Sequence, residues 1–342
     1  MILTADLTGQ TVLVAGAPKA AMRAIRRYRA AGATVHTLAA SEAFQEEMLD
    51  SVAMVVAVED AAPGWDMLPE ACRRQHVLLV KEATAVRGGL VTLIGGGPGP
   101  DDLLTMRALA ALKDADVVYF DRLGPHANLR WLAPGAELVD VGKRPGHHPV
   151  CQEDIQRRMV DSALQGHHVV RLKGGDPYVF GRGGEEVAAC IKAEVPVTVV
   201  PGISSAISVP GAAGIPVTHR DVSRMFTVVS GHLPLAEEEY RHLAGLGGTL
   251  VILMGVGTLP QLVAGLRREG MRADMPVAIV EQGFSESQRT TVSDLAGVVT
   301  AAGSARIKSP AVLVIGEVVR QADGRTGRQE LAQLTRLASA GA

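Results

Sequence analysis

Residues 91–123 have the sequence VTLIGGGPGPDDLLTMRALAALKDADVVYFDRL, which consists of an apolar strand, a Gly/Pro loop, a helix and a second apolar strand. Apolar residues recur at helical spacing over 102–113, and both strand segments are short, continuous apolar runs. This order is typical of α/β proteins with mainly parallel sheets, whose strands are covered on both faces. The loop 95–99 alone indicates little, because such glycine loops bind phosphates, cofactors or nothing.

The same alternation extends over most of the chain and predicts its domain organisation. Further predicted strands lie at 11–15, 34–38, 54–58, 77–80, 168–172 and 197–200. Further predicted helices lie at 19–31, 152–165 and 184–193. The alternation of strands and helices begins again at Leu90, directly after the joint Arg87-Gly88-Gly89, a predicted linker. We therefore expect a small Rossmann-like unit over 1–88, a second α/β region over 89–322 and a polar C-terminal tail over 323–342.

The composition of this 342-residue chain argues against nucleic acid as a partner. It holds 34 Lys and Arg against 36 Asp and Glu, and 3 % of its residues are aromatic. Nucleic-acid-binding proteins use basic stripes and stacking rings instead. The 3 cysteines show no metal or disulfide spacing, and the neighbouring His147 and His148 would point to opposite faces of a strand. We expect no metal, and a reducing, cytoplasmic compartment.

Two stretches without Asp, Glu, Lys or Arg, at 195–219 and 242–266, are long enough to suggest membrane spans. Four prolines interrupt the first, and six glycines with Pro260 interrupt the second. Neither therefore predicts a continuous transmembrane helix. We expect buried strands and their loops in both places, and no membrane partner. The N-terminal residues also lack the features of a signal peptide.

Residues 12–38 have the layout of a dinucleotide-binding βαβ unit. In the usual G-x-G-x-x-G/A pattern, Gly16 takes the first position and Ala21 the third, but Pro18 takes the second. Proline lacks an N–H and places a ring where a pyrophosphate would approach. No acidic residue for a ribose hydroxyl follows at 38–41. NAD binding is therefore not expected.

Residues 10–85 loosely resemble the N-terminal dehydrogenase part of siroheme synthases. In that resemblance Asp60, within Val58-Glu59-Asp60, takes the place of the family's catalytic aspartate. Because the phosphate loop is altered, we expect a degenerate precorrin-2 dehydrogenase-like domain that is a structural remnant. Two alternatives stay open: residual NAD-dependent dehydrogenase or chelatase activity, and a non-catalytic module for oligomerisation or regulation.

A second glycine cluster follows the predicted strand 168–172. The segment VVRLKGGDPYVFGRGGEE places Gly174, Gly175 and Asp176 just past that strand, at the edge where open α/β sheets bind ligands. Two glycine loops at strand ends predict a ligand between them.

The region after the joint is similar to uroporphyrinogen-III C-methyltransferases over about 230 residues. The motifs that carry the resemblance occur in the family's order: IGGGPGPDDLLT, VYFDRL, VGKRPGHHPVCQEDI, VVRLKGGDPYVFGRGGEE, VPGISSAISVPGAAGIPVTHRD, LMGV and MPVAIVEQG. The resemblance implies a two-lobed α/β methyltransferase, usually a homodimer, with S-adenosylmethionine bound between the lobes. A relative acting on a later precorrin or on diphthamide is the alternative within the fold, and the motifs VGKRPGHH and GIPVTHRD count against it.

The cofactor residues follow partly from chemistry and partly from the resemblance. Gly174, Gly175 and Asp176 can offer bare backbone and a carboxylate, and Pro98 shapes the first loop. The resemblance adds Val179, Ser204, Ser205, Met254 and Gly283. The family often has Thr-Ala in place of Ser204-Ser205 and Ile in place of Val179, which are conservative differences in size.

The implied substrate, uroporphyrinogen III, bears eight carboxylates, for which arginine forks are well suited. Candidate substrate-binding residues in or beside the motifs are Arg122, Arg144, Arg182, His219 and Arg220. Asp121, at the end of the strand 117–120, resembles the family's proton acceptor, and Lys143 resembles its proton donor. The resemblance implies methyl transfers at C2 and C7, which give precorrin-2 through precorrin-1 on the route to siroheme or cobalamin.

Overall fold

The computed structural model describes residues 6–59, 65–83, 88–121, 123–142 and 151–322. Backbone contacts divide the chain into two units, one of residues 1–96 with 104–202 and the other of residues 97–103 with 203–342. The described strands form three sheets, two in the first unit and one in the second. The boundaries expected at 88 and 322 remain predictions, and the tail 323–342 lies outside the described residues.

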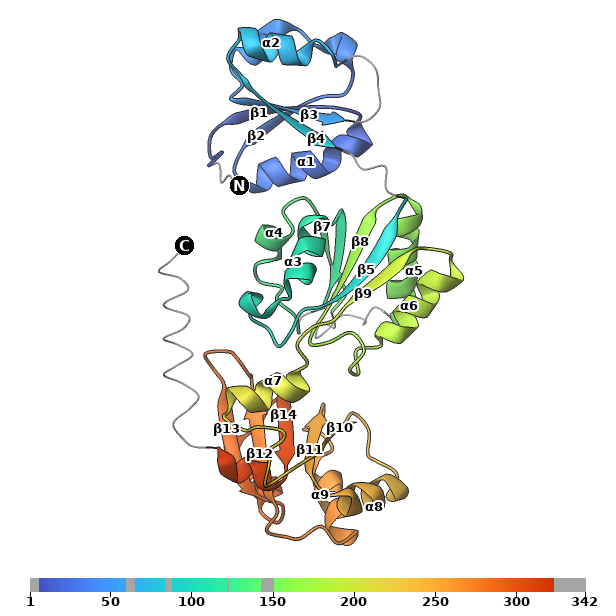
Figure 1. Cartoon of the computed structure of the whole chain (residues 1–342), viewed down its shortest axis with the longest axis vertical. Helices are drawn as coiled ribbons and strands as arrows, with labels where there is room; N and C mark the ends of the chain where they lie inside the picture. Colours follow the sequence, from blue (N-terminus) through green and yellow to red (C-terminus); the bar gives the residue numbers. More distant parts are fainter. Residues whose placement is uncertain (1–5, 60–64, 84–87, 122, 143–150, 323–342) are drawn as a thin grey trace. The chain divides into compact units, whose positions relative to one another are not determined.

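The N-terminal sheet is parallel throughout and has the strand order β2-β1-β3-β4. Its elements are β1 (Thr11–Ala15), α1 (Pro18–Ala30), β2 (Thr34–Leu38), β3 (Met54–Glu59), α2 (Leu68–Arg74) and β4 (Leu78–Ala83). Helix α1 covers one face of the sheet and α2 the other (Figure 1), and their apolar residues pack against the strands. This is the expected Rossmann-like α/β arrangement.

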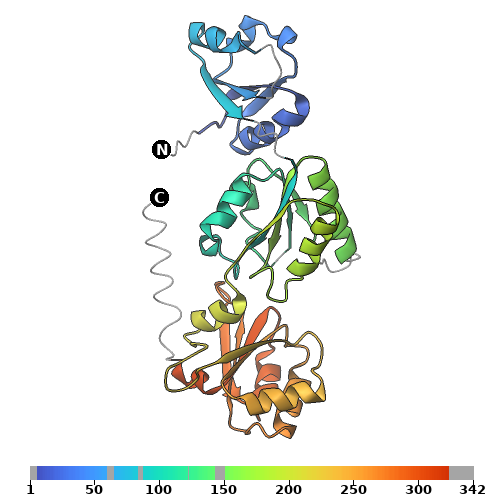
Figure 2. The same ribbon diagram turned by 45° about the vertical axis from the view of Figure 1, so that its right-hand side comes forward.

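The second sheet is also parallel and has the order β7-β6-β8-β5-β9. Its strands are β5 (Leu90–Gly95), β6 (Val117–Phe120), β7 (Glu137–Asp140), β8 (His168–Lys173) and β9 (Val197–Val200). Helices α3 (Met106–Lys113) and α4 (Leu129–Leu132) cover one face, while α5 (Gln152–Leu164) and α6 (Gly183–Lys192) cover the other (Figures 1 and 2). All five carboxyl ends therefore lie at one edge of this sheet.

The third sheet has the order β10-β11-β14-β12-β13 and is mixed, whereas the sequence predicts mainly parallel sheets. Its strands are β10 (Phe226–Ser230), β11 (Thr249–Leu253), β12 (Pro276–Glu281), β13 (Arg289–Asp294) and β14 (Ala311–Ile315). Only the β10–β11 pair is parallel. The connection from β12 to β13 is too short for a crossover, so these two strands pair antiparallel.

The helices of the second unit are α7 (Ser205–Ala212), α8 (Glu237–Leu246), α9 (Leu259–Arg268) and α10 (Val298–Ala305). Apolar residues of α8, α9 and α10 join the strands in one core cluster. The expectation of strands and loops in the two uncharged stretches is only partly right, because 195–219 contains α7 and 242–266 contains most of α9. Among the described residues, the helices are too short or too polar to cross a membrane.

Candidate active site

The carboxyl edge of the second sheet brings three glycines together, one each from the ends of β5, β8 and β9. A Cβ atom on Gly95 would lie 2.5 Å from the Cα atom of Gly202 and 2.6 Å from the carbonyl oxygen of Gly175. Backbone therefore touches backbone here, and no side chain fits. Gly175, which the sequence predicts as a cofactor residue, lies in this contact. The sequence identifies Gly95 only as part of the loop 95–99 and does not predict its contact with Gly202, because that contact joins distant parts of the sequence.

Asp176 fastens two of these loops together. Its Oδ1 accepts a hydrogen bond from the Tyr178 N–H at 2.8 Å, and its Oδ2 accepts one from the Gly202 N–H at 3.1 Å. The carboxylate therefore fixes the loop after β8 against the loop after β9. Each oxygen keeps capacity for a further hydrogen bond, because a carboxylate oxygen accepts two.

The loop after β6 packs against the loop after β8 and carries Asp121. A Cβ on Gly174 would lie 2.5 Å from the Cβ of Leu123, which explains the glycine at that position. The Leu123 N–H donates to Asp121 Oδ1 at 3.1 Å, and the Asp121 side chain keeps 26 % of its surface exposed. The structure thus brings the predicted proton acceptor beside the predicted cofactor loop.

The remaining predicted cofactor residues of the second unit lie where strands end or a helix begins. Ser204 is the N-cap of α7 and accepts a hydrogen bond from the Ala206 N–H at 3.3 Å, and Ser205 opens the helix. Met254 follows β11, and Gly283 follows β12. A Cβ on Gly283 would come within 2.7 Å of Val209 in α7, so that glycine lets the loop approach the helix.

Five of the eight non-glycine residues that have left-handed backbone geometry in the described part of the chain lie in the loops after β8, β11 and β12. Their φ values are 54° for Phe180, 59° for Arg182, 59° for Met254, 49° for Gln282 and 66° for Phe284. Such conformations are unfavourable for side chains with a Cβ and concentrate at binding sites. Val179 precedes the first of these residues, and Pro98 lies in the loop 97–103, which belongs to the second unit.

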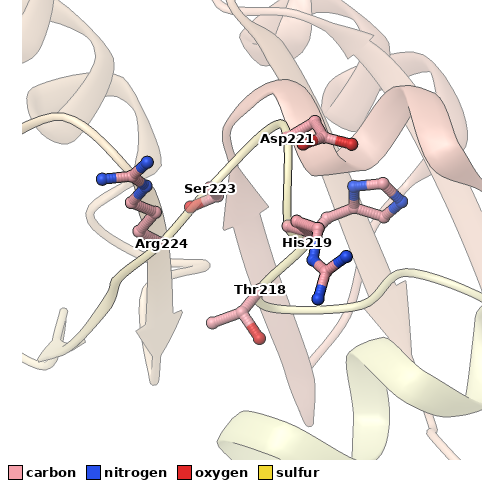
Figure 3. Close-up of a pocket in the computed structure, with 6 residues that line it drawn as sticks. Thr218, His219, Asp221, Ser223 and Arg224 are labelled. Atoms are coloured by element: carbon pink, nitrogen blue, oxygen red, sulfur yellow. The ribbon is translucent and has the colours of Figure 1, made fainter.

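Arg182 and the segment 218–224 supply the described candidates for substrate binding. The Arg182 guanidinium donates to both carboxylate oxygens of Glu185 at 2.8 and 2.6 Å, and this holds the pKa of Glu185 below its usual value. His219 and Arg220 line a hollow of about 470 Å³ together with Thr218, Asp221, Ser223 and Arg224. Figure 3 shows the side chain of Arg224 on the opposite side of this segment from His219 and Asp221.

Paired backbone hydrogen bonds hold the segment 218–224 in shape. The N–H of His219 donates to the Ser223 carbonyl at 2.9 Å, and the Ser223 N–H donates back to His219 at 2.9 Å. The buried hydroxyl of Thr249 donates to Ser223 Oγ at 3.0 Å, which anchors the segment to β11. The basic side chains therefore project from a fixed backbone.

Several predicted residues lie outside the described part of the chain. They are Asp60, Arg122, Lys143, Arg144, His147 and His148. Among the described residues no group of three or more His, Cys, Asp or Glu side chains could hold a metal ion.

The sequence-based predictions missed Arg171 and Glu186, which form a charged cluster with Lys173 near the site. Arg171, Lys173 and Glu186 are 4 %, 4 % and 0 % exposed and lie beneath the carboxyl end of β8. Desolvation by burial, followed by repulsion from Arg171, lowers the pKa of Lys173. Arg171 and Lys173 stand at alternate positions of the otherwise apolar strand VVRLK, and this pattern is the sequence signal that could have indicated a buried charged cluster.

Comparison with known proteins assigns the family. The model of the tetrapyrrole (corrin/porphyrin) methylases matches residues 90–298, starting at the first residue of β5. The chain belongs to the tetrapyrrole methylase family. A uroporphyrinogen III methyltransferase of Methanosarcina barkeri is 45 % identical to this tetrapyrrole methylase over 239 residues, which cover 69 % of this chain and 94 % of the relative.

Two further relatives extend the comparison. A siroheme synthase of Gluconobacter oxydans is 45 % identical over 250 residues, covering 72 % of this chain but only 52 % of that protein. The crystal structure of a Thermus thermophilus uroporphyrin-III C-methyltransferase, complexed with S-adenosylhomocysteine, matches with a TM-score of 0.58 and 41 % identity. This match covers 68 % of the present chain and 99 % of the Thermus chain.

Proposed function

We propose that the protein transfers methyl groups from S-adenosylmethionine to uroporphyrinogen III. The observation that carries the proposal is the 45 % identity to a uroporphyrinogen III methyltransferase across 94 % of that enzyme's length. The related Thermus structure contains S-adenosylhomocysteine, the demethylated form of the proposed donor. Two successive transfers, at C2 and then C7, would give precorrin-2 through precorrin-1, for siroheme or cobalamin biosynthesis.

The donor set of this chain suits S-adenosylmethionine. Gly174 and Gly175 offer bare backbone, Asp176 offers a carboxylate for an ammonium or hydroxyl, and Ser204 and Ser205 offer hydroxyls. Pro98, Val179, Met254 and Gly283 complete the proposed cofactor residues, and Met254 is 47 % exposed. When bound, the cofactor supplies an electrophilic methyl group on a sulfonium. The task of the protein is to hold that methyl group in line with a pyrrole carbon, which provides much of the rate.

Asp121 is the proposed proton acceptor after methyl transfer. A pyrrole carbon that has gained a methyl group leaves a positive charge on the macrocycle, and a proton must depart to neutralise it. The partly exposed carboxylate at the end of β6 is suited to receive that proton, since a correctly placed general base contributes about 10²- to 10⁴-fold to the rate. Lys143 is proposed as the proton donor on the basis of its motif alone.

Cationic side chains are proposed to bind the macrocycle's carboxylates. The described candidates are Arg182, His219 and Arg220, and the proposal also includes Arg122 and Arg144. These local cations explain how a chain of net charge −2 can bind a polyanion. We also infer a cytoplasmic homodimer that uses no nucleic acid and no metal.

A bifunctional siroheme synthase is the second candidate function. The match to a siroheme synthase and the parallel sheet β2-β1-β3-β4 favour it. Pro18 at the start of α1 opposes it, because the helix loses an N–H where a dinucleotide phosphate would bind. Fluorescence titration with NAD distinguishes the two: we expect no saturable binding, and tight binding would favour the bifunctional enzyme.

A comparison of methyl acceptors tests the main proposal. The protein is incubated anaerobically with methyl-labelled S-adenosylmethionine and, separately, with uroporphyrinogen III, a later precorrin or the protein precursor of diphthamide. We expect label to move only to uroporphyrinogen III. Transfer to one of the other acceptors, with none to uroporphyrinogen III, would contradict the proposed substrate while leaving the family unchanged.

A further inference from the structure

A buried cluster of charged side chains lies directly behind Asp121. Arg171 and Lys173 are two positions apart in β8, so both point to the face that α5 and α6 cover. Glu186, near the start of α6, meets them there and is fully buried. Burying charge in this way is unfavourable unless the groups are paired.

Glu186 pairs with both cations at once. Its Oε1 accepts hydrogen bonds from Arg171 Nε at 3.1 Å and from Gln152 Nε2 at 3.0 Å. Lys173 Nζ donates to the same Oε1 at 3.1 Å and lies 3.0 Å from Oε2. The carboxylate therefore fixes the guanidinium of Arg171 from behind.

The other side of that guanidinium faces Asp121. Arg171 Nη1 donates to the Leu172 carbonyl at 2.7 Å, and Nη2 lies 3.5 Å from Asp121 Oδ2. This last distance is long for a hydrogen bond, and catalytic hydrogen bonds are often long in ligand-free sites. Only 5 % of the Arg171 side chain is exposed, against 26 % for Asp121. Arg171 thus links the buried Glu186 to the partly exposed carboxylate of Asp121, which a substrate can reach.

The arrangement needs an arginine for geometric reasons. One edge of the planar guanidinium contacts Glu186 while Nη2 faces Asp121, which the single ammonium of lysine cannot do. Stability alone does not explain the cluster, because apolar residues of similar volume often replace buried ion pairs without loss of stability. Arg171 and Lys173 together balance the charges of Glu186 and Asp121.

We propose that Arg171 is a positioning residue of the methyl-transfer site. Glu186 anchors Arg171, and Arg171 orients the Asp121 carboxylate toward the proton that leaves the macrocycle. The Leu123 N–H on Oδ1 and Arg171 on Oδ2 together define the plane of that carboxylate. The inference rests on the proposed function, because it assigns Arg171 a role through the proposed proton acceptor.

A double-mutant cycle tests the inference in the full-length protein. Arg171→Lys, Asp121→Asn and the double variant are compared for kcat, for KM and for calorimetric affinity toward S-adenosylhomocysteine. We expect Arg171→Lys to lower kcat by about 10- to 100-fold, with KM and cofactor affinity unchanged, because a misplacement near 1 Å costs about that much. The double variant should be no slower than Asp121→Asn alone, since Arg171 acts only through Asp121.

Several results would overturn the inference. Multiplying losses in the double variant, or a parallel fall in cofactor affinity, would show that Arg171 acts independently or only supports the fold. An unchanged kcat in Asp121→Asn would remove the residue through which Arg171 is said to act. If the wild-type protein itself transfers no methyl group, the proposed function fails, and this inference fails with it.

Two additional variants complete the design. If Arg171→Lys does not fold, Glu186→Asp withdraws the anchor by one methylene and should again lower kcat without adding to Asp121→Asn. Arg157→Lys is the matched control, because Arg157 forms an exposed ion pair with Asp154 on α5. Its kcat should equal that of the wild type, and a comparable loss there would make the effect of Arg171→Lys non-specific.

Discussion

Gly202 has no room for a methyl group, and this makes it a sensitive residue of the candidate site. A Cβ there would lie 2.6 Å from both the Cα and the carbonyl carbon of Gly95, and closer still to the Gly175 carbonyl oxygen. We expect Gly202→Ala to lower the free energy of unfolding by about 1–3 kcal/mol and to weaken binding of S-adenosylhomocysteine. Denaturant unfolding and calorimetry measure the two effects.

The matched control for this substitution is Gly211→Ala, since a Cβ on Gly211 would meet no atom within 4 Å. Its stability and ligand affinity should stay at the wild-type values or rise slightly, because alanine favours a helix. Equal behaviour of the two variants would refute the close backbone contact at the sheet edge.

The cysteines should differ strongly in reactivity. Burial raises the pKa of the Cys190 thiol to about 11, while Cys151 is exposed. At about pH 8 iodoacetamide should therefore modify Cys151 in the folded protein and Cys190 only after denaturation, as peptide mass spectrometry would show. Equal alkylation rates would contradict this burial.

The raised pKa of Cys190 also makes stability depend on pH. The neutral thiol favours folding below about pH 8.5, and this contribution to the free energy of unfolding is lost as the pH rises toward the pKa in the folded state.

Single residues also show how far sequence reasoning reaches. Asp121 and the Gly174–Asp176 loop follow strands whose ends the apolar pattern predicts within one residue, so their place at the sheet edge is confirmed. Arg171 and Glu186 were missed, because only the packing of α6 on β8 brings them together. The roles of all these residues in cofactor binding and catalysis stay predictions.

Helix α3 provides a test at the scale of one element. The apolar spacing predicts a helix from residue 102, but α3 begins at Met106, after a short 3₁₀ turn over Asp101–Leu103. Thr105 sets the start, because its Oγ1 accepts the Ala108 N–H at 3.2 Å. Thr105→Ala should therefore cost about 0.5–2 kcal/mol in thermal or denaturant unfolding. Thr105→Ser keeps the hydroxyl and should retain most of the stability, and a similar loss in both variants would exclude the cap.

The C-terminal sheet shows where element-level prediction fails. Continuous apolar runs identify buried strands such as β11, but they do not reveal strand direction. Strand β13, RTTVSD, lies at the edge of its sheet and alternates exposed with half-buried residues, so it lacks an apolar run. Its antiparallel pairing with β12 depends on a short connection, which changes the sheet from parallel to mixed.

At the scale of the whole molecule, the family match from residue 90 to 298 leaves the N-terminal sheet outside the methylase region. We therefore expect a chain of residues 89–342 to keep methyl transfer at a rate similar to the full chain. Parallel activity assays measure this, and sedimentation of both chains tests whether the N-terminal sheet contributes to the expected homodimer. Loss of activity in the soluble, shortened chain would show that the sheet has a part in catalysis.

Mass spectrometry of the reaction product tests the central claim most directly. The full-length protein is incubated anaerobically with uroporphyrinogen III and an excess of S-adenosylmethionine, and the tetrapyrroles are analysed over time. We predict a transient product with one added methyl group, followed by a final product with two. Binding of S-adenosylhomocysteine without any methyl transfer to uroporphyrinogen III would contradict the account.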